Sequence, residues 1–326
     1  MEFQVKVVIL SFVISIITSM IIIPILRKLK VGQIERDDGP QSHLKKQGTP
    51  TMGGIIMAVT ITILTLISSV GIFGEEVKQE GIKLLPLAFV TVGFGLVGFV
   101  DDFIKLVLKN TKGLKPMYKM FGLLIVAVGY TVYLVKVLNL GTETYIPFVK
   151  QYIGLPVWIY IPFAIFVLLG TTNAVNLTDG IDGLSTSVTT IIITALTIIG
   201  IIFGVPEISL MGAILIGACL GFLLFNLHPA KVFMGDTGSL LLGGAIAGIA
   251  LYLKMPFILI ILALIPIIET VSVMIQVLYF KKTGNRIFKM APIHHHFELS
   301  GWNENKIVSI FSVITLVLCI IGIFSV

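Results

Sequence analysis

The chain has 326 residues, of which 56% are hydrophobic and 12% are charged, and its formal net charge is +6. Soluble domains carry roughly a quarter charged residues, so this composition and a mean hydropathy of +1.04 exclude a soluble globular protein. The only two cysteines, Cys219 and Cys319, lie inside apolar runs, where a thiol packs as a small hydrophobic group. We therefore expect neither a disulfide nor a thiolate metal site.

Apolar runs that can cross a bilayer as helices recur from one end of the chain to the other. Glycine, proline, asparagine and charged residues separate them. The runs predict helices at 5–27, 51–72, 84–104, 120–138, 157–175, 184–204, 208–226, 238–254, 256–280 and 307–325. Because no stretch remains for a soluble domain, we expect one polytopic membrane domain over residues 1–326, an all-α bundle of about ten transmembrane helices.

The loops between these helices form two sets, one on each side of the membrane. One set carries most of the 23 lysines and arginines and consists of the loops at about 28–50, 105–119, 176–183, 227–237 and 281–306. By the positive-inside rule this set is cytoplasmic, so both termini are expected on the extracytoplasmic side. The polar motifs lie at the same boundary, which predicts a functional site at the cytoplasmic face.

The first of these loops ends in the segment from Lys46 to Gly54, which reads Lys-Gln-Gly-Thr-Pro-Thr-Met-Gly-Gly. Lysine, threonine and glycine backbone contact phosphates or bases in many proteins, but this order matches no P-loop. Taken alone, the segment is a weak signal.

Asp101 and Asp102 end the third predicted helix after an unbroken apolar stretch. Two adjacent carboxylates at the membrane boundary are costly unless something cationic shares them, which implies a metal ion or a pair of lysines. A simple salt bridge to Lys105, one turn further on, is the structural alternative. On a continuing helix the two side chains point about 100° apart, so we expect one to face a cleft and the other a lysine such as Lys105 or Lys119.

Four short polar side chains follow at strict three-residue spacing, namely Asn173, Asn176, Asp179 and Asp182. In an ideal helix each would be rotated by about 60° from the last, so we expect the glycines at 180 and 183 to turn the backbone and let all four converge on one pocket. Ordinary turn formation is the alternative.

Asp236 lies just before the eighth predicted helix, between Gly235 and the pair Thr237-Gly238. Taken alone, it would be interpreted as a helix N-cap. However, the glycines permit close backbone approach, and free N–H groups at a helix start suit a phosphate. Carboxylate and phosphate oxygens together form a typical Mg²⁺ environment, so we predict that Asp236 binds Mg²⁺.

Three consecutive histidines, His294 to His296, occupy the last cytoplasmic loop. Adjacent residues cannot all point at one ion, so hydrogen bonding to a diphosphate, a sugar or a peptide carboxylate fits better than zinc binding. Glu269 is an isolated acid inside the ninth predicted helix, three residues after Pro266. It marks a kink, a polar helix contact or a functional group, and the sequence names no partner for it.

Together these segments resemble the polyprenyl-phosphate N-acetylhexosamine-1-phosphate transferases over nearly the whole chain. Residues 46–54, 173–183, 233–236 and 291–298 resemble most specifically the phospho-N-acetylmuramoyl-pentapeptide transferases. The resemblance implies transfer of phospho-N-acetylmuramoyl-pentapeptide from its UDP conjugate, UDP-N-acetylmuramoyl-pentapeptide, to undecaprenyl phosphate, giving lipid I and UMP in peptidoglycan synthesis. It further implies a Mg²⁺ cofactor, ten helices, a homodimer among the lipids of the bacterial cell membrane, and no nucleic acid partner.

The resemblance also assigns roles to the matched positions. Catalysis would rest on Asp101, Asp102, Asp236 and His294. Mg²⁺ would be bound by Asp236, with Asp101, Asp102 and Asn176 as further candidate ligands. The substrates would be bound by Lys46, Thr51, Lys105, Lys119, Asn173, Asn176, Asp179, Gly180, Asp182, Asn226, Phe233, His295 and His296. Asp101 would orient or deprotonate the lipid phosphate, and a one-step route and a two-step covalent route both stay open.

Two other functions compete with this interpretation. A sister transferase that uses UDP-N-acetylglucosamine for teichoic acid or polysaccharide would share the aspartate motifs, so only the histidine segment discriminates, and it favours the muramoyl-pentapeptide donor. A lipid or solute transporter would keep its polar groups near the bilayer midplane, often on inverted repeats. Here the polar groups gather at one boundary, which argues against transport.

Overall fold

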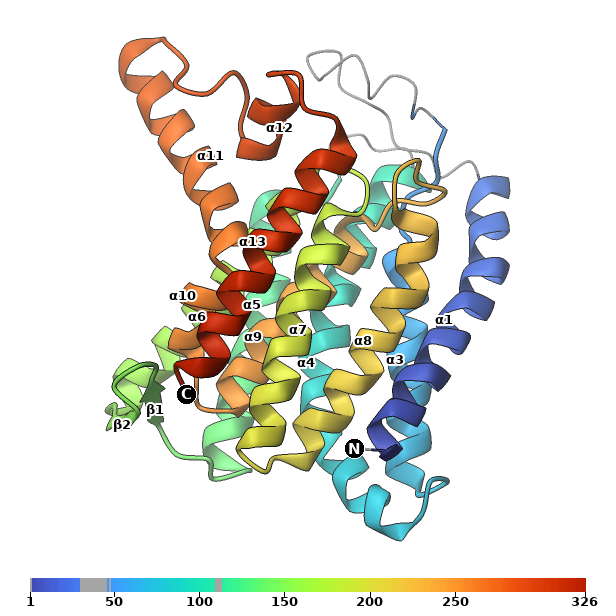
Figure 1. The fold of residues 1–326 in the computed structure, drawn as a ribbon, viewed down its shortest axis with the longest axis vertical. Coiled ribbons are helices and arrows are strands. Elements are labelled where there is room, and N and C mark those ends of the chain that lie inside the picture. The colour runs from blue at the N-terminus through green and yellow to red at the C-terminus, as the bar shows by residue number, and fades with distance from the viewer. Residues whose placement is uncertain (1, 30–45, 47, 109–112) are drawn as a thin grey trace.

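The computed structural model describes residues 2–29, 46, 48–108 and 113–326, and these residues are mostly helical (Figure 1). Long helices run side by side, and residue 2 and the C-terminus lie at the same end of the bundle. The long helices are α1 (Glu2–Lys28), α3 (Gly54–Val70), α4 (Glu75–Leu106), α5 (Pro116–Lys136), α6 (Val157–Thr178), α7 (Leu184–Ile202), α8 (Pro206–Asn226), α9 (Gly235–Tyr252), α11 (Leu264–Thr283) and α13 (Glu304–Phe324).

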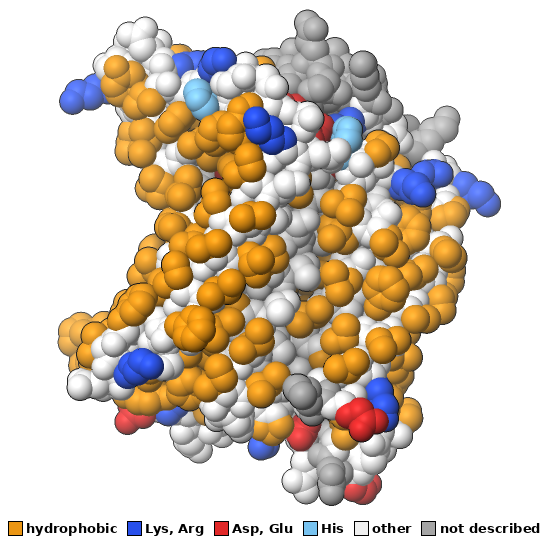
Figure 2. Space-filling view, viewed as in Figure 1, with side chains coloured by type: hydrophobic (Ala, Val, Ile, Leu, Met, Phe, Trp, Pro, Cys, Tyr) orange, Lys and Arg blue, Asp and Glu red, His pale blue; other side chains and the backbone are white. Residues whose placement is uncertain are grey.

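The surface has the charge distribution of a membrane protein. Figure 2 shows hydrophobic side chains over the middle of the molecule and charged side chains towards its two ends. In the described part of the chain, eight helices are long and apolar enough to span a bilayer, namely α1, α4, α5, α6, α7, α8, α11 and α13. The prediction of a helical membrane protein is confirmed, whereas ten crossings remain a prediction because α3 is shorter and α9 is not among the eight.

The prediction of one continuous ninth helix over residues 256–280 is wrong. The structure breaks it into a 3-10 turn (Pro256–Ile258), α10 (Leu259–Leu262) and α11, with Ala263 between the two α-helices. Pro266 in the first turn of α11 has no N–H to continue a helix from the preceding turn, so the chain restarts there. Figure 1 shows α11 leaning away from the bundle.

Two short strands also depart from the all-α prediction. β1 (Glu143–Ile146) and β2 (Gln151–Gly154) form an antiparallel hairpin between α5 and α6, in which Glu143 pairs with Gly154 and Ile146 with Gln151. The hairpin lies at the same end of the bundle as the chain termini (Figure 1). Its threonine, tyrosine and isoleucine residues favour strands, but four residues are too few to stand out beside long apolar runs.

The helix α9 forms the centre of the bundle, and all of its residues from Thr237 to Tyr252 are buried. Glycines bring neighbouring backbones against its first turn: a Cβ on Gly54 of α3 would overlap the backbone of Gly238, and one on Gly98 of α4 would overlap the carbonyl of Asp236. Small residues allow this close approach where lipid supplies no hydrophobic drive between helices. The ends of α3 and α4 are therefore held against the start of α9.

Candidate active site

The polar segments predicted from the sequence meet at the end of the bundle opposite the termini. The helices α4, α6 and α8 end there, and α5, α7, α9 and α13 begin there. The chain direction therefore brings the aspartates of α4, the amide and carboxylate series of α6 and the start of α9 to one side.

The carboxylate of Asp236 is bound by three side chains. Its Oδ2 accepts hydrogen bonds from Lys105 Nζ at 3.1 Å and Lys119 Nζ at 2.8 Å, and its Oδ1 accepts one from Asn176 Nδ2 at 2.8 Å. Asn176 also donates to Ser239 Oγ at 2.8 Å. The N-cap alternative is thus wrong for Asp236, because its carboxylate faces lysines from α4 and α5 rather than the N–H groups of its own helix.

Asp101 shares the same two lysines. Its Oδ2 lies 2.7 Å from Lys105 Nζ and 3.6 Å from Lys119 Nζ, while its Oδ1 accepts the backbone N–H of Leu114 at 2.7 Å. Lys105 therefore does more than form a local salt bridge within α4, since it also reaches Asp236. The two carboxylates and two ammonium groups form a charge-balanced cluster that we call the Asp–Lys centre, consisting of Asp101, Lys105, Lys119 and Asp236.

Asp102 has a different task from its neighbour. Its Oδ2 accepts from the backbone N–H of Thr237 at 2.9 Å and from Thr237 Oγ1 at 2.7 Å, and its Oδ1 accepts from the N–H of Asp236 at 3.3 Å. Met234, at the N-cap position of α9, offers no such bond. Asp102 therefore caps α9 from a neighbouring helix. One of the two aspartates faces lysines, as expected, and it is Asp101, whereas Asp102 faces the backbone of α9.

The three-residue series does not converge on one pocket. The chain remains α-helical through Thr178, so the rotation between successive members persists, and the Asn173 amide donates to Leu169 O of its own helix at 2.7 Å. Only Asn176 reaches Asp236. Asp179 follows the end of α6, where burial and then the charge of Asp236 raise the pKa of its carboxyl to about 8.

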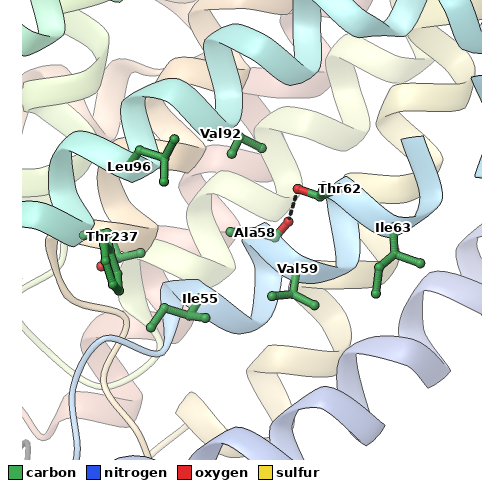
Figure 3. Close-up of a pocket in the computed structure, with 10 residues that line it drawn as sticks. Ile55, Ala58, Val59, Thr62, Ile63, Val92, Leu96 and Thr237 are labelled. Atoms are coloured by element: carbon green, nitrogen blue, oxygen red, sulfur yellow. Dashed lines mark hydrogen bonds between the residues drawn. The ribbon is translucent and has the colours of Figure 1, made fainter. Parts of the chain in front are cut away.

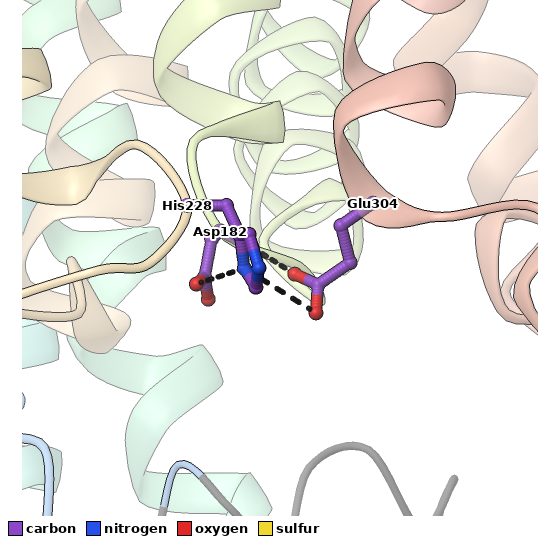
Figure 4. Close-up of side chains that lie close together, drawn as sticks. All are labelled: Asp182, His228 and Glu304. Carbon is purple, nitrogen blue, oxygen red and sulfur yellow. Dashed lines mark hydrogen bonds and ion pairs between the residues drawn. The ribbon is translucent and has the colours of Figure 1, made fainter.

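Asp182 belongs to a second polar cluster (Figure 4). Lys46 Nζ lies 2.7 Å from both Asp182 Oδ1 and Glu304 Oε2, and His228 Nδ1 lies 3.0 Å from Asp182 Oδ2. Burial lowers the pKa of Lys46, but its hydrogen bonds to the two carboxylates outweigh that effect and raise it. Lys46 therefore remains charged and holds the start of α13 against the loop after α6.

The loop that carries Thr51 is attached to the loop before α9. The N–H of Phe233 donates to Pro50 O at 2.8 Å, and the N–H of Gly53 donates to Phe233 O at 2.8 Å. Asn226 supports the second loop from within, because it accepts from Thr186 Oγ1 at 2.7 Å and donates to a carbonyl of that loop. Thr51, Phe233 and Asn226 are thus brought to the same end as the Asp–Lys centre.

The three histidines have three different partners. They lie on α12 (Ile293–Glu298). His294 is fully buried with its Nδ1 3.1 Å from Glu269 Oε2, His295 Nδ1 lies 3.2 Å from Glu298 Oε2, and His296 Nδ1 accepts the N–H of Lys289 at 3.1 Å. The partner of Glu269, which the sequence did not indicate, is therefore His294.

Two groups of carboxylates could hold a metal ion. Ligand atoms of Asp182, His228 and Glu304 lie within 4.8 Å of one another, but the ammonium of Lys46 already bridges both carboxylates there. In the Asp–Lys centre, Asp236 is 19% exposed at its side chain, and lysines also bind its carboxylate. Hard carboxylate oxygens beside two lysines suit Mg²⁺ together with a phosphate better than they suit a softer metal.

An apolar pocket of about 350 Å³ lies between α3 and α4 (Figure 3). Thr237, whose hydroxyl binds Asp102, is at one end of it, and the pocket is lined by Ile55, Ala58, Val59, Thr62, Ile63, Val92, Gly95, Leu96, Phe99 and Thr237. Almost all of its lining is apolar, so the pocket is unsuited to a nucleotide or a sugar.

Comparison with known proteins shows the family to which this chain belongs. Residues 84–254 match the profile of glycosyl transferase family 4, and residues 46–56 match signature 1 of the phospho-N-acetylmuramoyl-pentapeptide transferases. A phospho-N-acetylmuramoyl-pentapeptide transferase of Acetivibrio thermocellus is 51% identical over 325 residues, covering 99% of this chain and 95% of the relative. The chain belongs to this family.

Other phospho-N-acetylmuramoyl-pentapeptide transferases are similar to this chain over nearly its whole length. One from Clostridium perfringens is 51% identical over 315 residues, covering 97% of this chain and 96% of its own. One from Caldicellulosiruptor bescii is 45% identical over 315 residues, covering 97% of this chain and 95% of the relative. As a member of this transferase family the chain is an enzyme of the bacterial cell membrane, and the transporter alternative is set aside.

Sequence reasoning missed several residues of these polar clusters. Glu304 and His228 complete the cluster around Lys46, while Thr237 and Ser239 contact Asp102 and Asn176. Glu304 follows Asn303, whose side chain caps α13, so in the sequence it resembles an ordinary acid in a first helical turn. Its only signal was its position at the end of the bundle that carries the other motifs.

Proposed function

We propose that the protein transfers phospho-N-acetylmuramoyl-pentapeptide from its UDP conjugate to undecaprenyl phosphate, giving lipid I and UMP in peptidoglycan synthesis. The names of its relatives and the signature at 46–56 support this substrate pair. The observation that carries the proposal is the Asp–Lys centre, in which the ammonium groups of Lys105 and Lys119 each lie within 3.6 Å of both the Asp101 and the Asp236 carboxylate. Such a group can bind a phosphate and a hard cation together.

Phosphoryl transfer needs repulsion between phosphates to be screened and the line of attack to be held. Lys105 and Lys119 each contact Asp236 and Asp101, so a phosphate entering the centre can take over their N–H groups. The carboxylates then lose their cationic partners and become available to a cation. In this proposal Asp101 orients the lipid phosphate, and the ionised phosphate oxygen attacks the donor.

Mg²⁺ is the cofactor in this proposal, and it would supply charge neutralisation at the donor diphosphate. Asp236 is the principal ligand because its carboxylate is the most accessible of the three aspartates, with Asp101 beside it. Asp102 is a less suitable ligand, since both of its oxygens accept backbone N–H groups. Asn176 offers its amide oxygen once its N–H groups are engaged by Asp236 and Ser239.

The donor would lie between the Asp–Lys centre and the Lys46 cluster. The two are connected by the loop from Asp179 to Asp182, which follows α6, and His294 packs against Gly180 of this loop. In this proposal the nucleotide and its diphosphate contact residues of these two clusters and the loops beside them, namely Lys46, Thr51, Asn176, Asp179, Gly180, Asp182, Asn226 and Phe233, with His295 and His296 towards the sugar and peptide. Asn173 is assigned to the donor only by its position in the motif, since its amide bonds within α6.

The orientation in the membrane follows from charge. The end of the bundle with the site carries Arg27, Lys28, Lys281 and Lys282 at the ends of α1 and α11 in addition to the lysines of the centre. We therefore place this end in the cytoplasm, the termini and the hairpin outside, and count ten crossings with α3 and α9 included. A homodimer embedded in membrane lipids completes the proposal.

The test is a donor comparison with purified protein in lipid and detergent. Undecaprenyl phosphate and Mg²⁺ are combined with either UDP-N-acetylmuramoyl-pentapeptide or UDP-N-acetylglucosamine, and UMP and lipid product are measured. UMP and a lipid product with the first donor alone support the proposal. Turnover with the second donor alone would make the chain a sister transferase, and no UMP with either donor would contradict both.

A further inference from the structure

Glu269 on α11 and His294 on α12 form a pair in which Glu269 has no role in the reaction described above. Both side chains are fully buried, and His294 Nδ1 lies 3.1 Å from Glu269 Oε2. The backbone N–H of His294 also points at Glu269 Oε2, at 3.4 Å. An acid inside a membrane helix is costly and is usually functional, so this pair calls for an explanation.

The two contacts determine where the histidine ring carries its proton. Because a backbone N–H points at Glu269 Oε2, this oxygen is an acceptor. A lone pair on Nδ1 would repel a carboxylate oxygen at 3.1 Å, so this contact favours hydrogen on Nδ1, although Nδ1 forms no regular hydrogen bond within the described residues. The remaining ring nitrogen, Nε2, is then the one that can meet a substrate.

Nε2 points at the loop that we assign to the donor. A Cβ on Gly180 would collide with Nε2, so the ring edge lies directly against this glycine, and any other residue at 180 would displace the ring. In the described residues Nε2 has no hydrogen-bond partner although it is buried. A buried ring nitrogen without a protein partner, aimed at a substrate loop, indicates that a substrate group supplies the partner.

The pair is not needed merely to tie α11 to the loop that follows it. Gln276, two turns further along α11, already does so: its Nε2 donates to Phe288 O at 3.1 Å, and its Oε1 accepts the N–H groups of Ile287 at 3.1 Å and Phe288 at 3.0 Å. A second tether made from a buried acid would add cost without a structural need. The role of Glu269 therefore concerns the ring of His294 rather than the course of the backbone.

We propose that Glu269 is a positioning residue for the transfer reaction, which holds the proton of His294 on Nδ1 and so presents Nε2, beside Gly180, to the sugar-phosphate donor. The inference rests on the proposed donor role of the histidine loop. Glu269 itself touches no substrate and acts only through His294.

The kinetic test is a double-mutant cycle with Glu269→Gln and His294→Ala. Each single variant should weaken the donor side of the reaction, seen as a loss of about tenfold or more in kcat/KM for the donor, with the KM for undecaprenyl phosphate unchanged. In the His294→Ala background, Glu269→Gln should add no further loss. Losses that multiply would overturn the proposal, because Glu269 would then act independently of the ring.

Gln276→Ala is the matched structural control. It removes a tether on the same helix and to the same loop but leaves His294 untouched. It should lower the thermal unfolding temperature while keeping the donor kcat/KM within about twofold. If Gln276→Ala lost as much donor kcat/KM as Glu269→Gln, Glu269 would be a structural tether only, and the proposal would be overturned.

A spectroscopic readout separates this inference from the proposed activity. In protein labelled with ¹⁵N-histidine, the signals of His294 are assigned by their loss in His294→Gln, and the ring shifts report which nitrogen carries the proton. Nδ1 should be protonated in the unmutated protein, and Glu269→Gln should change this pattern. A bare Nδ1, or ring shifts unaffected by Glu269→Gln, would refute the positioning role even if no variant had any activity. Should Glu269→Gln fail to fold, the unmutated spectrum alone still decides.

Discussion

Asp101 and Asp102 are neighbours in sequence but face different parts of the molecule. Their side chains leave α4 about 100° apart, which sends Asp101 to the lysines and Asp102 to the start of α9. The sequence indicated that the two would differ, since adjacent helical residues cannot share one direction. It did not indicate that the partner of Asp102 would be backbone, because α9 lies more than 130 residues further along the chain.

Substitution of each aspartate should therefore give a different defect. Asp101→Asn should lower turnover by about a hundredfold or more, about 2.7 kcal/mol in barrier, with donor affinity little changed. Asp102→Asn should lower the thermal unfolding temperature as well as the rate, since a lost helix cap costs about 1 kcal/mol. Steady-state rates, calorimetric donor titration and thermal unfolding measure the three quantities. If Asp101→Asn keeps its rate and loses donor affinity, Asp101 is a binding residue.

Lys46 neutralises two buried carboxylates and should matter for stability as well as for binding. Lys46→Met leaves Asp182 and Glu304 without their cation, a change that costs about 3 kcal/mol or more in buried networks. Lys46→Arg keeps the charge and is the control, so its unfolding temperature should lie between those of Lys46→Met and the unmutated protein. Equal unfolding temperatures for all three proteins would mean that the cluster is not a stabilising one.

At the level of elements, hydropathy located the long helices well because apolar runs are the strongest sequence signal in a membrane protein. It failed where a break or a contact depends on tertiary structure. The interruption at Ala263, the β1–β2 hairpin and the continuation of α6 as a helix through Asn176 all depend on neighbours that a local pattern does not contain. The motif residues could be found because their spacing is local. Glu304 and His228 were not found because their role depends on contacts with distant parts of the chain.

The close approach of α4 to α9 should make Gly98 sensitive to any side chain. A Cβ there would overlap the carbonyl of Asp236, so Gly98→Ala must push the first turn of α9 away from Asp101 and Lys105. Overpacking of this kind costs about 1–3 kcal/mol, and the rate should fall with it. Gly170→Ala on α6 is the control because its Cβ would have no atom of another element within 4 Å. If both variants unfold and turn over alike, the backbone contact does not hold the site.

For the whole molecule, charge and helix direction together predict which end is cytoplasmic. Phe148 in the hairpin and Lys231 before α9 are exposed at opposite ends, and both native cysteines are buried. In intact cells, a membrane-impermeant maleimide should therefore label Phe148→Cys readily and Lys231→Cys only after the membrane is opened. Labelling in the reverse order would invert the topology and place the Asp–Lys centre outside the cell.

The central claim is that the Asp–Lys centre carries out a Mg²⁺-dependent transfer to a lipid phosphate. It is tested most directly by measuring UMP release from UDP-N-acetylmuramoyl-pentapeptide and undecaprenyl phosphate over a Mg²⁺ titration, with the unmutated protein and Asp236→Asn. The unmutated protein should show saturable Mg²⁺ dependence that is abolished by chelation. Asp236→Asn should stay folded, because no core is emptied, yet lose turnover at every Mg²⁺ concentration. An Asp236→Asn protein with the rate and Mg²⁺ dependence of the unmutated protein would contradict the account.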